Sequence, residues 1–304
     1  MSVYLPTLEN LGKVANDLRD GKLAILPTET VYGLAADAKN PEAVADIFKL
    51  KGRPSDNPLI VHIASVDQIS DFASVVPDSV AALAAAFMPG PLTLVLKKQP
   101  WVSDIVTGGL DTVAIRMPDH PACLAVMELG NLALAMPSAN LFMGLSPTNV
   151  NMIHPSLIAG VSTIIDGGAC PLGIESTVLD ATGIPTVLRP GSITRQEIEA
   201  VLQLAISEGS DTRKAPGMYK RHYAPQTRCL VSTKVADDQA GLVFDDPRNK
   251  NQIQMPLDPK EYAKVLYATM ADLDARGLDE FYVVMPPITD AWIAVLDRLS
   301  KATA

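Results

Sequence analysis

One stretch decides how this chain can fold and what it can hold: Lys49-Leu50-Lys51-Gly52-Arg53-Pro54-Ser55-Asp56-Asn57-Pro58-Leu59-Ile60-Val61-His62. It predicts the end of a helix, then a loop broken by Gly and Pro, then an apolar strand. It gathers three cations, one acid and one histidine in a chain of net charge −9. Fixed positive charge on such a loop suits a small polyanion, for example a nucleoside triphosphate. The alternative is a solvated helix C-terminus, where Lys and Arg complement the helix dipole.

Helices and strands are predicted on both sides of this stretch. One helix begins after Thr7, a good N-cap, and stops at Gly21. A strand follows at Leu23 to Leu26, and Asn40-Pro41 starts a second helix. Further strands are predicted at 58–64, 91–97, 112–117, 132–137, 162–166, 176–180 and 185–189, and further helices at about 77–88, 119–129, 147–159 and 194–206. Because some of the strands are consecutive, we expect an α/β fold whose sheet is partly antiparallel.

A change in composition divides the chain. Residues 1–206 form the predicted first domain, and a linker, 207–226, opens with a polar stretch that lacks apolar periodicity. The pattern restarts in a small second α/β domain, 227–304. Its strands are predicted near 228–232, 241–244, 252–255 and 280–285, and its helices at 259–276 and 290–301.

The linker carries an unusual cluster, Tyr219-Lys220-Arg221-His222-Tyr223. These side chains suit stacking on a base and pairing with phosphate. The alternative is a segment that only docks on the first domain.

Composition and charge exclude several classes of protein. The N-terminus lacks a signal peptide, and the apolar run from Val80 to Leu96 is broken by Pro89-Gly90-Pro91, so we expect a soluble cytoplasmic protein with no membrane contact. The three cysteines lie far apart and the four histidines are scattered, which predicts no disulfide and no protein-held metal. An acidic pI near 4.9 argues against a broad basic face for nucleic acid.

Four segments carry the chemistry, although neither common nucleotide fingerprint is present. They are the opening stretch, Pro27–Leu34 after a buried strand, Met136–Asn140 with Gly144–Thr148, and Gly173–Val178 with Leu188–Gly191. Strand ends are where α/β sheets place ligand contacts, although capped turns and a lone surface Arg explain the same residues. Arg116 is a stronger candidate, because an arginine inside an apolar strand needs a partner anion.

Taken together, these segments resemble the YrdC-like threonylcarbamoyl-AMP synthase family in its long form. The motifs that carry the resemblance are PTETVYGL at 27–34, KGRPSDNPLIVHI at 51–63, PSAN at 137–140, SPT at 146–148, GIESTV at 173–178, LRPG at 188–191 and APGMYKRHYAP at 215–225. The resemblance implies a YrdC-type twisted mixed sheet with helices around a basic concave cavity. It also implies a small Rossmann-like C-terminal domain.

The same resemblance implies a nucleotidyltransferase that converts L-threonine, bicarbonate and ATP, accompanied by Mg²⁺, into L-threonylcarbamoyl-AMP and pyrophosphate. The product would serve threonylcarbamoyladenosine formation next to the tRNA anticodon through downstream transfer proteins, with tRNA binding weak or indirect. Such a step needs positioned cations but no protein nucleophile. A linker that acts as a lid would shield the labile carbamate from water.

The resemblance also assigns roles to single residues. Arg116 would pair with the threonine carboxylate, and Lys51 and Arg53 are the expected catalytic cations. The threonine site is expected at Thr30, His62, Arg116, Met136 and Ser176, and the ATP site at Lys51, Arg53, Asn57, Ser138, Asn140, Ser146, Arg189, His222 and Tyr223.

The chain departs from the family pattern in two places. Phe142-Met143 replace the usual Ser-Gly after Asn140, and Tyr219-Lys220 stand in swapped order. Two other functions stay open: an RNA-binding module of the YrdC type, which the acidic charge disfavours, and a carbamoyl-adenylate enzyme, whose cysteine-rich modules are missing here.

Overall fold

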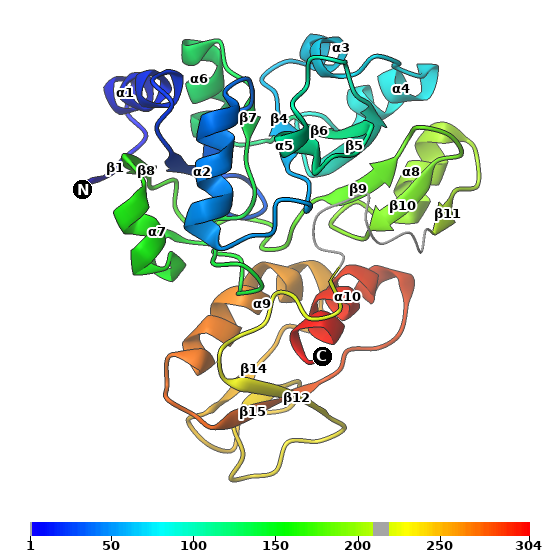
Figure 1. The fold of residues 1–304 in the computed structure, drawn as a ribbon. Helices are drawn as coiled ribbons and strands as arrows, with labels where there is room; N and C mark the ends of the chain where they lie inside the picture. Colours follow the sequence, from blue (N-terminus) through cyan, green and yellow to red (C-terminus); the bar gives the residue numbers. More distant parts are fainter. Residues whose placement is uncertain (1, 209–218) are drawn as a thin grey trace.

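The computed structural model describes residues 2–208 and 219–304, and in it two domains lie one above the other (Figure 1). The larger domain is built on a sheet with strand order β1-β8-β2-β3-β7-β4-β6-β5-β9-β10-β11. Its strands are β1 (Ser2–Tyr4), β2 (Ala24–Leu26), β3 (Gly33–Asp37), β4 (Ile60–His62), β5 (Leu92–Lys97), β6 (Thr112–Arg116), β7 (Leu134–Ala135), β8 (Thr163–Ile165), β9 (Thr177–Asp180), β10 (Thr186–Arg189) and β11 (Ser207–Glu208). The sheet contains both parallel and antiparallel pairs of neighbouring strands, which confirms the predicted mixed sheet.

Helices cover this sheet (Figure 1), and its apolar side chains are buried in one large cluster and two smaller ones. They are α1 (Leu8–Arg19), α2 (Pro41–Lys51), α3 (Ile69–Phe72), α4 (Asp78–Phe87), α5 (Asp104–Thr107), α6 (Pro121–Gly130), α7 (Pro155–Gly160) and α8 (Arg195–Leu202), with short 3₁₀ turns at Val66–Gln68 and Val150–Met152. The predicted caps are confirmed, because Thr7 accepts a hydrogen bond from the Asn10 amide and Asn40 accepts one from Ala43.

The opening stretch folds as its sequence predicts. Helix α2 ends at Lys51, and Gly52 turns the chain with a left-handed φ of +62°, which a glycine adopts without strain. The loop then leads into β4, which lies between β6 and β7. The loop therefore ends in the middle of the sheet, beside the strands that bear the other candidate residues.

Two segments differ from the predictions. No strand is predicted at residues 33–37, which form strand β3 and pair with β2 and β7. Glycine and alanine have weak strand propensity, so burial between two neighbours decides this segment. The single helix predicted at 147–159 is split, because Pro155 cannot stand inside a helix and begins α7 instead.

The smaller domain contains a wholly parallel sheet with the order β12-β15-β13-β14. Its strands are β12 (Arg228–Ser232), β13 (Gly241–Val243), β14 (Gln252–Gln254) and β15 (Glu280–Val284), and its helices are α9 (Pro259–Asp274) and α10 (Ile293–Ala302), with a 3₁₀ turn at Asp290–Trp292. These elements lie where the sequence predicts them. Among the described residues, no helix combines the length and the apolar character that crossing a bilayer requires.

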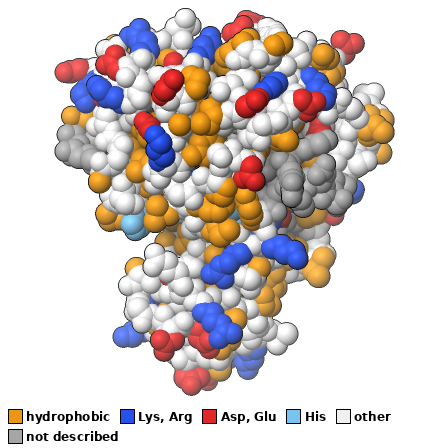
Figure 2. Space-filling model, viewed as in Figure 1, with side chains coloured by type: hydrophobic (Ala, Val, Ile, Leu, Met, Phe, Trp, Pro, Cys, Tyr) orange, Lys and Arg blue, Asp and Glu red, His pale blue; other side chains and the backbone are white. Residues whose placement is uncertain are grey.

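Helices α9 and α10 face the large domain (Figure 1). A Cβ at Gly173, which has φ +75°, would lie 2.5 Å from backbone atoms of Lys264 in α9, so the two backbones touch there. Figure 2 shows apolar side chains at the junction, and Lys and Arg mixed with Asp and Glu over the large domain on the face drawn. Of the predicted lid, 207–226, residues 209–218 lie outside the described residues.

Candidate active site

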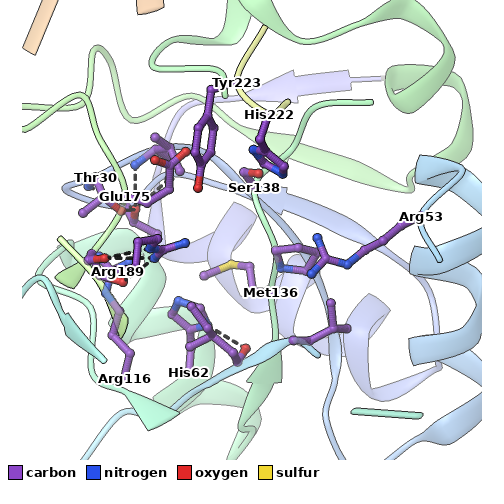
Figure 3. A pocket seen from close by; sticks show the side chains of 16 residues that line it. Thr30, Arg53, His62, Arg116, Met136, Ser138, Glu175, Arg189, His222 and Tyr223 are labelled. Atoms are coloured by element: carbon purple, nitrogen blue, oxygen red, sulfur yellow. Dashed lines mark hydrogen bonds between the residues drawn. The ribbon is translucent and has the colours of Figure 1, made fainter. Parts of the chain in front are cut away.

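A cavity opens where the ends of several strands meet the domain junction (Figure 3). Its walls come from the turn between β2 and β3, the loop before β4, the ends of β4, β6 and β10, the 136–138 segment, and residues of the linker. The lining residues are Thr28, Thr30, Val31, Arg53, Leu59, Ile60, His62, Arg116, Met136, Pro137, Ser138, Glu175, Ser176, Arg189, His222 and Tyr223. The lining contains three guanidinium groups and one carboxylate, so its formal charge is positive.

Arg53 enters the cavity from the loop that follows α2. Its Nη2 donates to the carbonyl oxygen of Pro58 at 2.8 Å, and its Nε donates to that of Asn57 at 3.3 Å. Burial lowers the pKa of the guanidinium to about 10, which leaves it charged at neutral pH. The residue thus closes its own loop and presents a cation to the cavity.

Lys51, two residues earlier, points elsewhere. Its ammonium donates to the carbonyl oxygens of Ser138, at 2.6 Å, and Asn140. The Asn140 side chain in turn donates to the carbonyls of Leu141 and Gly144, both at 2.8 Å. Burial, and then the charge of Arg53, lowers the pKa of Lys51. Lys51 therefore supports the 138–144 turn from beneath.

His62 and Arg116 are neighbours because β4 and β6 run parallel in register, His62 opposite Arg116. The His62 Nδ1 lies 3.2 Å from the carbonyl oxygen of Ile60. Burial, reinforced by the charge of Arg116, lowers the pKa of His62 to about 3, so the ring is neutral at physiological pH. Arg116 Nη2 lies 2.6 Å from Glu29 Oε1, off the line of a hydrogen bond, so the contact is a buried ion pair. Glu29 is the partner anion that the strand arginine needs.

Ser176 and Arg189 form the opposite wall. Arg189 donates through Nε and Nη2 to the Ser176 carbonyl oxygen, at 3.1 and 2.9 Å, and through Nη2 to the Ser176 hydroxyl at 3.0 Å. The same hydroxyl lies 2.7 Å from that of Thr93. Ser176 is therefore fixed on both sides.

The linker residues His222 and Tyr223 cover the cavity from the junction side (Figure 3). Their rings meet edge to face at 4.0 Å between centroids. Burial lowers the pKa of His222 to about 3, although Glu175 opposes the shift, and burial raises that of Tyr223 to about 12. The Tyr223 hydroxyl and His222 Nδ1 are buried without a hydrogen-bond partner among the described residues, so both atoms are available to a ligand.

Most residues expected from the sequence meet in this cavity. Those that line it are Thr30, Arg53, His62, Arg116, Met136, Ser138, Ser176, Arg189, His222 and Tyr223. Lys51, Asn57, Asn140 and Ser146 are buried behind its wall instead.

Sequence reasoning missed two carboxylates, Glu29 and Glu175. Both stand inside the motifs that carry the resemblance, PTETVYGL and GIESTV. Threonines flank Glu29 and a serine follows Glu175, so neither acid stands out in an apolar run as Arg116 does.

Comparison with known proteins covers nearly the whole chain. The Sua5–YciO–YrdC family model, described as "Telomere recombination", matches residues 16–191. The model of the threonylcarbamoyl-AMP synthase C-terminal domain matches residues 193–304. The chain is 38% identical to the threonylcarbamoyl-AMP synthase of Pyrococcus abyssi, over 95% of this chain and 92% of that one. It is 38% identical to that of Bacillus subtilis, over 96% and 92%.

A solved structure extends this likeness to three dimensions. Crystalline Pyrococcus abyssi Sua5 complexed with L-threonine superposes with a TM-score of 0.88 at 36% identity, covering 98% of this chain and 95% of that one. The likeness therefore includes both domains.

Proposed function

The chain belongs to the threonylcarbamoyl-AMP synthase family, and from this premise we propose that it makes L-threonylcarbamoyl-AMP from L-threonine, bicarbonate and ATP. The chain carries both the catalytic and the C-terminal family domains. Its full-length relatives in an archaeon, a bacterium and a yeast are threonylcarbamoyl-AMP synthases. The observation in the site that supports this activity best is the positive cavity with guanidinium groups of Arg53, Arg116 and Arg189 on separate walls.

The chemistry agrees with these groups. The carbamate oxygen of N-carboxythreonine attacks the α-phosphorus of ATP, the bond to the β-phosphate bridging oxygen breaks, and pyrophosphate leaves. Negative charge is spread over the phosphoryl oxygens in that step, so positioned cations lower its barrier without a protein nucleophile. Arg53 and Arg189 would face the triphosphate, with Lys51, Asn57, Asn140 and Ser146 holding the surrounding backbone in place.

The threonine site would lie on the other side of the cavity. Arg116 would bind the carboxylate of threonine, and neutral His62 would contact the amino acid without adding charge. Thr30 and Ser176 supply hydroxyl groups, and Met136 supplies an apolar surface and its backbone. Ser138, His222 and Tyr223 would close the site over the nucleotide.

Several partners follow from the reaction. We propose that Mg²⁺ enters bound to the triphosphate, as part of the substrate. Downstream proteins would transfer the threonylcarbamoyl group to the adenosine next to the tRNA anticodon, and tRNA itself would bind weakly or indirectly. Residues 1–206 would hold the substrates, 207–226 would link the domains, and 227–304 would support the site from below.

The test is product formation by purified protein. With ATP, Mg²⁺, L-threonine and bicarbonate, we expect threonine-dependent release of pyrophosphate and an AMP adduct with the mass of L-threonylcarbamoyl-AMP. Omission of threonine or bicarbonate should abolish both signals, and serine in place of threonine is the matched control for the β-methyl group. Folded protein that makes neither product would overturn the proposal.

A further inference from the structure

A buried carboxylate joins the two domains beside the cavity. Glu175 Oε2 accepts hydrogen bonds from Arg298 Nε at 2.8 Å and from the Tyr267 hydroxyl at 3.0 Å, both from the smaller domain. Its Oε1 accepts the hydrogen bond of the Ser146 hydroxyl at 2.5 Å. Arg298 has 0% of its surface exposed, so the ion pair is shielded from water and salt.

The same guanidinium group reaches the linker. Arg298 Cζ lies 5.0 Å from the centroid of the Tyr223 ring, within the range of a cation–π contact. The same ring stacks on Tyr267, with the centroids 5.8 Å apart and the planes 29° apart. One arginine of the smaller domain therefore touches both Glu175 and the tyrosine that lines the cavity.

The position of Glu175 determines the position of the cavity wall next to it. The next residue, Ser176, receives three hydrogen bonds from Arg189. A Cβ added at Gly191 would lie 2.7 Å from the Glu175 carbonyl oxygen and 2.6 Å from the Ser176 carbonyl carbon, so these backbones are in direct contact. A shift of Glu175 would therefore move the Ser176 and Arg189 groups that face the substrates.

We propose that Arg298, in the smaller domain, is a positioning residue for the synthase reaction. Through Glu175 it fixes the position of the cavity wall, and through Tyr223 it fixes the position of the linker. The inference rests on the proposed function for its reaction. It assigns the smaller domain a direct part in the geometry of the site, through the ion pair with Glu175 and the contact with Tyr223.

Removal of Arg298 should leave a signature in the pH profile. Burial by itself raises the pKa of Glu175, but Arg298, followed by Arg189 and the Ser146 hydrogen bond, brings it to about 2. Without Arg298 the pKa should rise, so that the acid becomes neutral at mildly acidic pH and no longer holds its partners. The groups that face Glu175 are Arg298 and Tyr267 from α10 and α9, Arg189 from β10, Ser146 from its turn, and His222 and Tyr223 from the linker.

The experiment compares Arg298→Met, Glu175→Gln and the double variant with wild type. Arg248→Met is the matched control, because Arg248 forms an exposed ion pair with Asp237 in the same domain. For each protein, kcat and KM for ATP and threonine are measured by pyrophosphate release from pH 5 to 9, alongside thermal unfolding.

We expect Arg298→Met to remain folded and to lose about 100-fold in kcat/KM, the scale set by a displacement of about 1 Å in a reacting site. Its activity should fall further toward pH 5, whereas Glu175→Gln should show no such additional fall. The double variant should lose no more than the worse single variant, because both act through one contact. Arg248→Met should behave as wild type.

Other outcomes overturn the inference. Wild-type kinetics and pH profile in folded Arg298→Met would do so, as would losses that multiply in the double variant. If Arg298→Met does not fold, the kinetics and pH profile of Arg298→Lys test the inference instead, since lysine keeps the charge but cannot contact Glu175 and Tyr223 together. A loss of about tenfold without the acidic fall would support the inference, and wild-type kinetics would overturn it.

The proposed function fails separately, if wild type itself makes no product. Threonine affinity, measured calorimetrically without turnover, then tests Arg298 alone. Weaker binding in Arg298→Met than in Arg248→Met supports its positioning role, and equal binding overturns it.

Discussion

Replacement of Arg53 by methionine separates what this side chain does for the loop from what it does for the reaction. The guanidinium donates to the carbonyl oxygens of Asn57 and Pro58, at 3.3 and 2.8 Å. A hydrogen bond from a charged donor contributes about 1.5–3 kcal/mol, and the longer bond belongs at the low end. We therefore expect Arg53→Met to lower the free energy of unfolding of the large domain by about 3 kcal/mol.

The loss of activity should be larger than the loss of stability explains. Removal of a cation that stabilises a phosphoryl-transfer transition state costs about 10³-fold or more in rate, close to 4 kcal/mol. Arg53→Lys keeps a charge but not the fork that reaches two carbonyls, so we expect it to recover part of both losses. Arg19→Met, a change at an exposed arginine of α1, is the control.

Two measurements keep these effects apart. Pyrophosphate release gives kcat/KM for ATP, and urea unfolding gives stability. The chain has two tryptophans, one in each domain, so a Trp292→Phe background leaves Trp101 to report on the large domain. If Arg53→Met unfolds at lower urea as expected but keeps wild-type kcat/KM, Arg53 serves the loop alone, and its place in the reaction is refuted.

Three further substitutions follow from the structure. Burial holds the pKa of His62 near 3 in the folded protein, against about 6.5 in the unfolded chain. The free energy of unfolding should therefore fall as the pH drops below 6.5, by about 1.4 kcal/mol per pH unit. Urea titrations should show a shallower fall in His62→Asn. Tyr32→Phe removes a hydroxyl that both donates to and accepts from the loop backbone after β8, and should cost about 2 kcal/mol in unfolding with kcat retained. Gly191→Ala places a Cβ 2.3 Å from the Thr177 amide nitrogen and should lower both Tm and kcat/KM, whereas Gly183→Ala, which meets nothing within 4 Å, should change neither.

The sequence predicts elements well wherever the deciding signal is local. Helix α2 is bounded by Asn40-Pro41 at one end and Gly52 at the other, and each acts through atoms only a few residues away. Strand β3 escapes prediction because Gly33–Asp37 becomes a strand only through its neighbours β2 and β7. Burial between those neighbours outweighs the weak strand propensity of glycine and alanine.

The site shows the same contrast between local signals, which the sequence reveals, and long-range contacts, which it does not. Motifs identify most of the lining residues, since each wall is one short segment placed at the end of a strand. The partners of those residues come from elsewhere in the chain, as when Arg116 pairs with Glu29 and Glu175 pairs with Arg298. Charge alone shows that Arg116 requires an anion, but only the folded sheet brings Glu29 to it. In the same way, only the docking of α10 brings Arg298 to Glu175.

The two cations of the opening stretch illustrate how one turn can divide similar residues between two tasks. Lys51 is the last residue of α2, and the left-handed turn at Gly52 sends Arg53 in another direction. Lys51 contacts carbonyl oxygens and, among the described residues, no carboxylate, so burial lowers its pKa and its charge is costly. In the proposed reaction that cost would be offset by an anion bound beside Ser138, because negative charge there favours the protonated ammonium. The ligand would thus strengthen the turn that Lys51 supports, while Arg53 would meet the ligand from the other side of the loop.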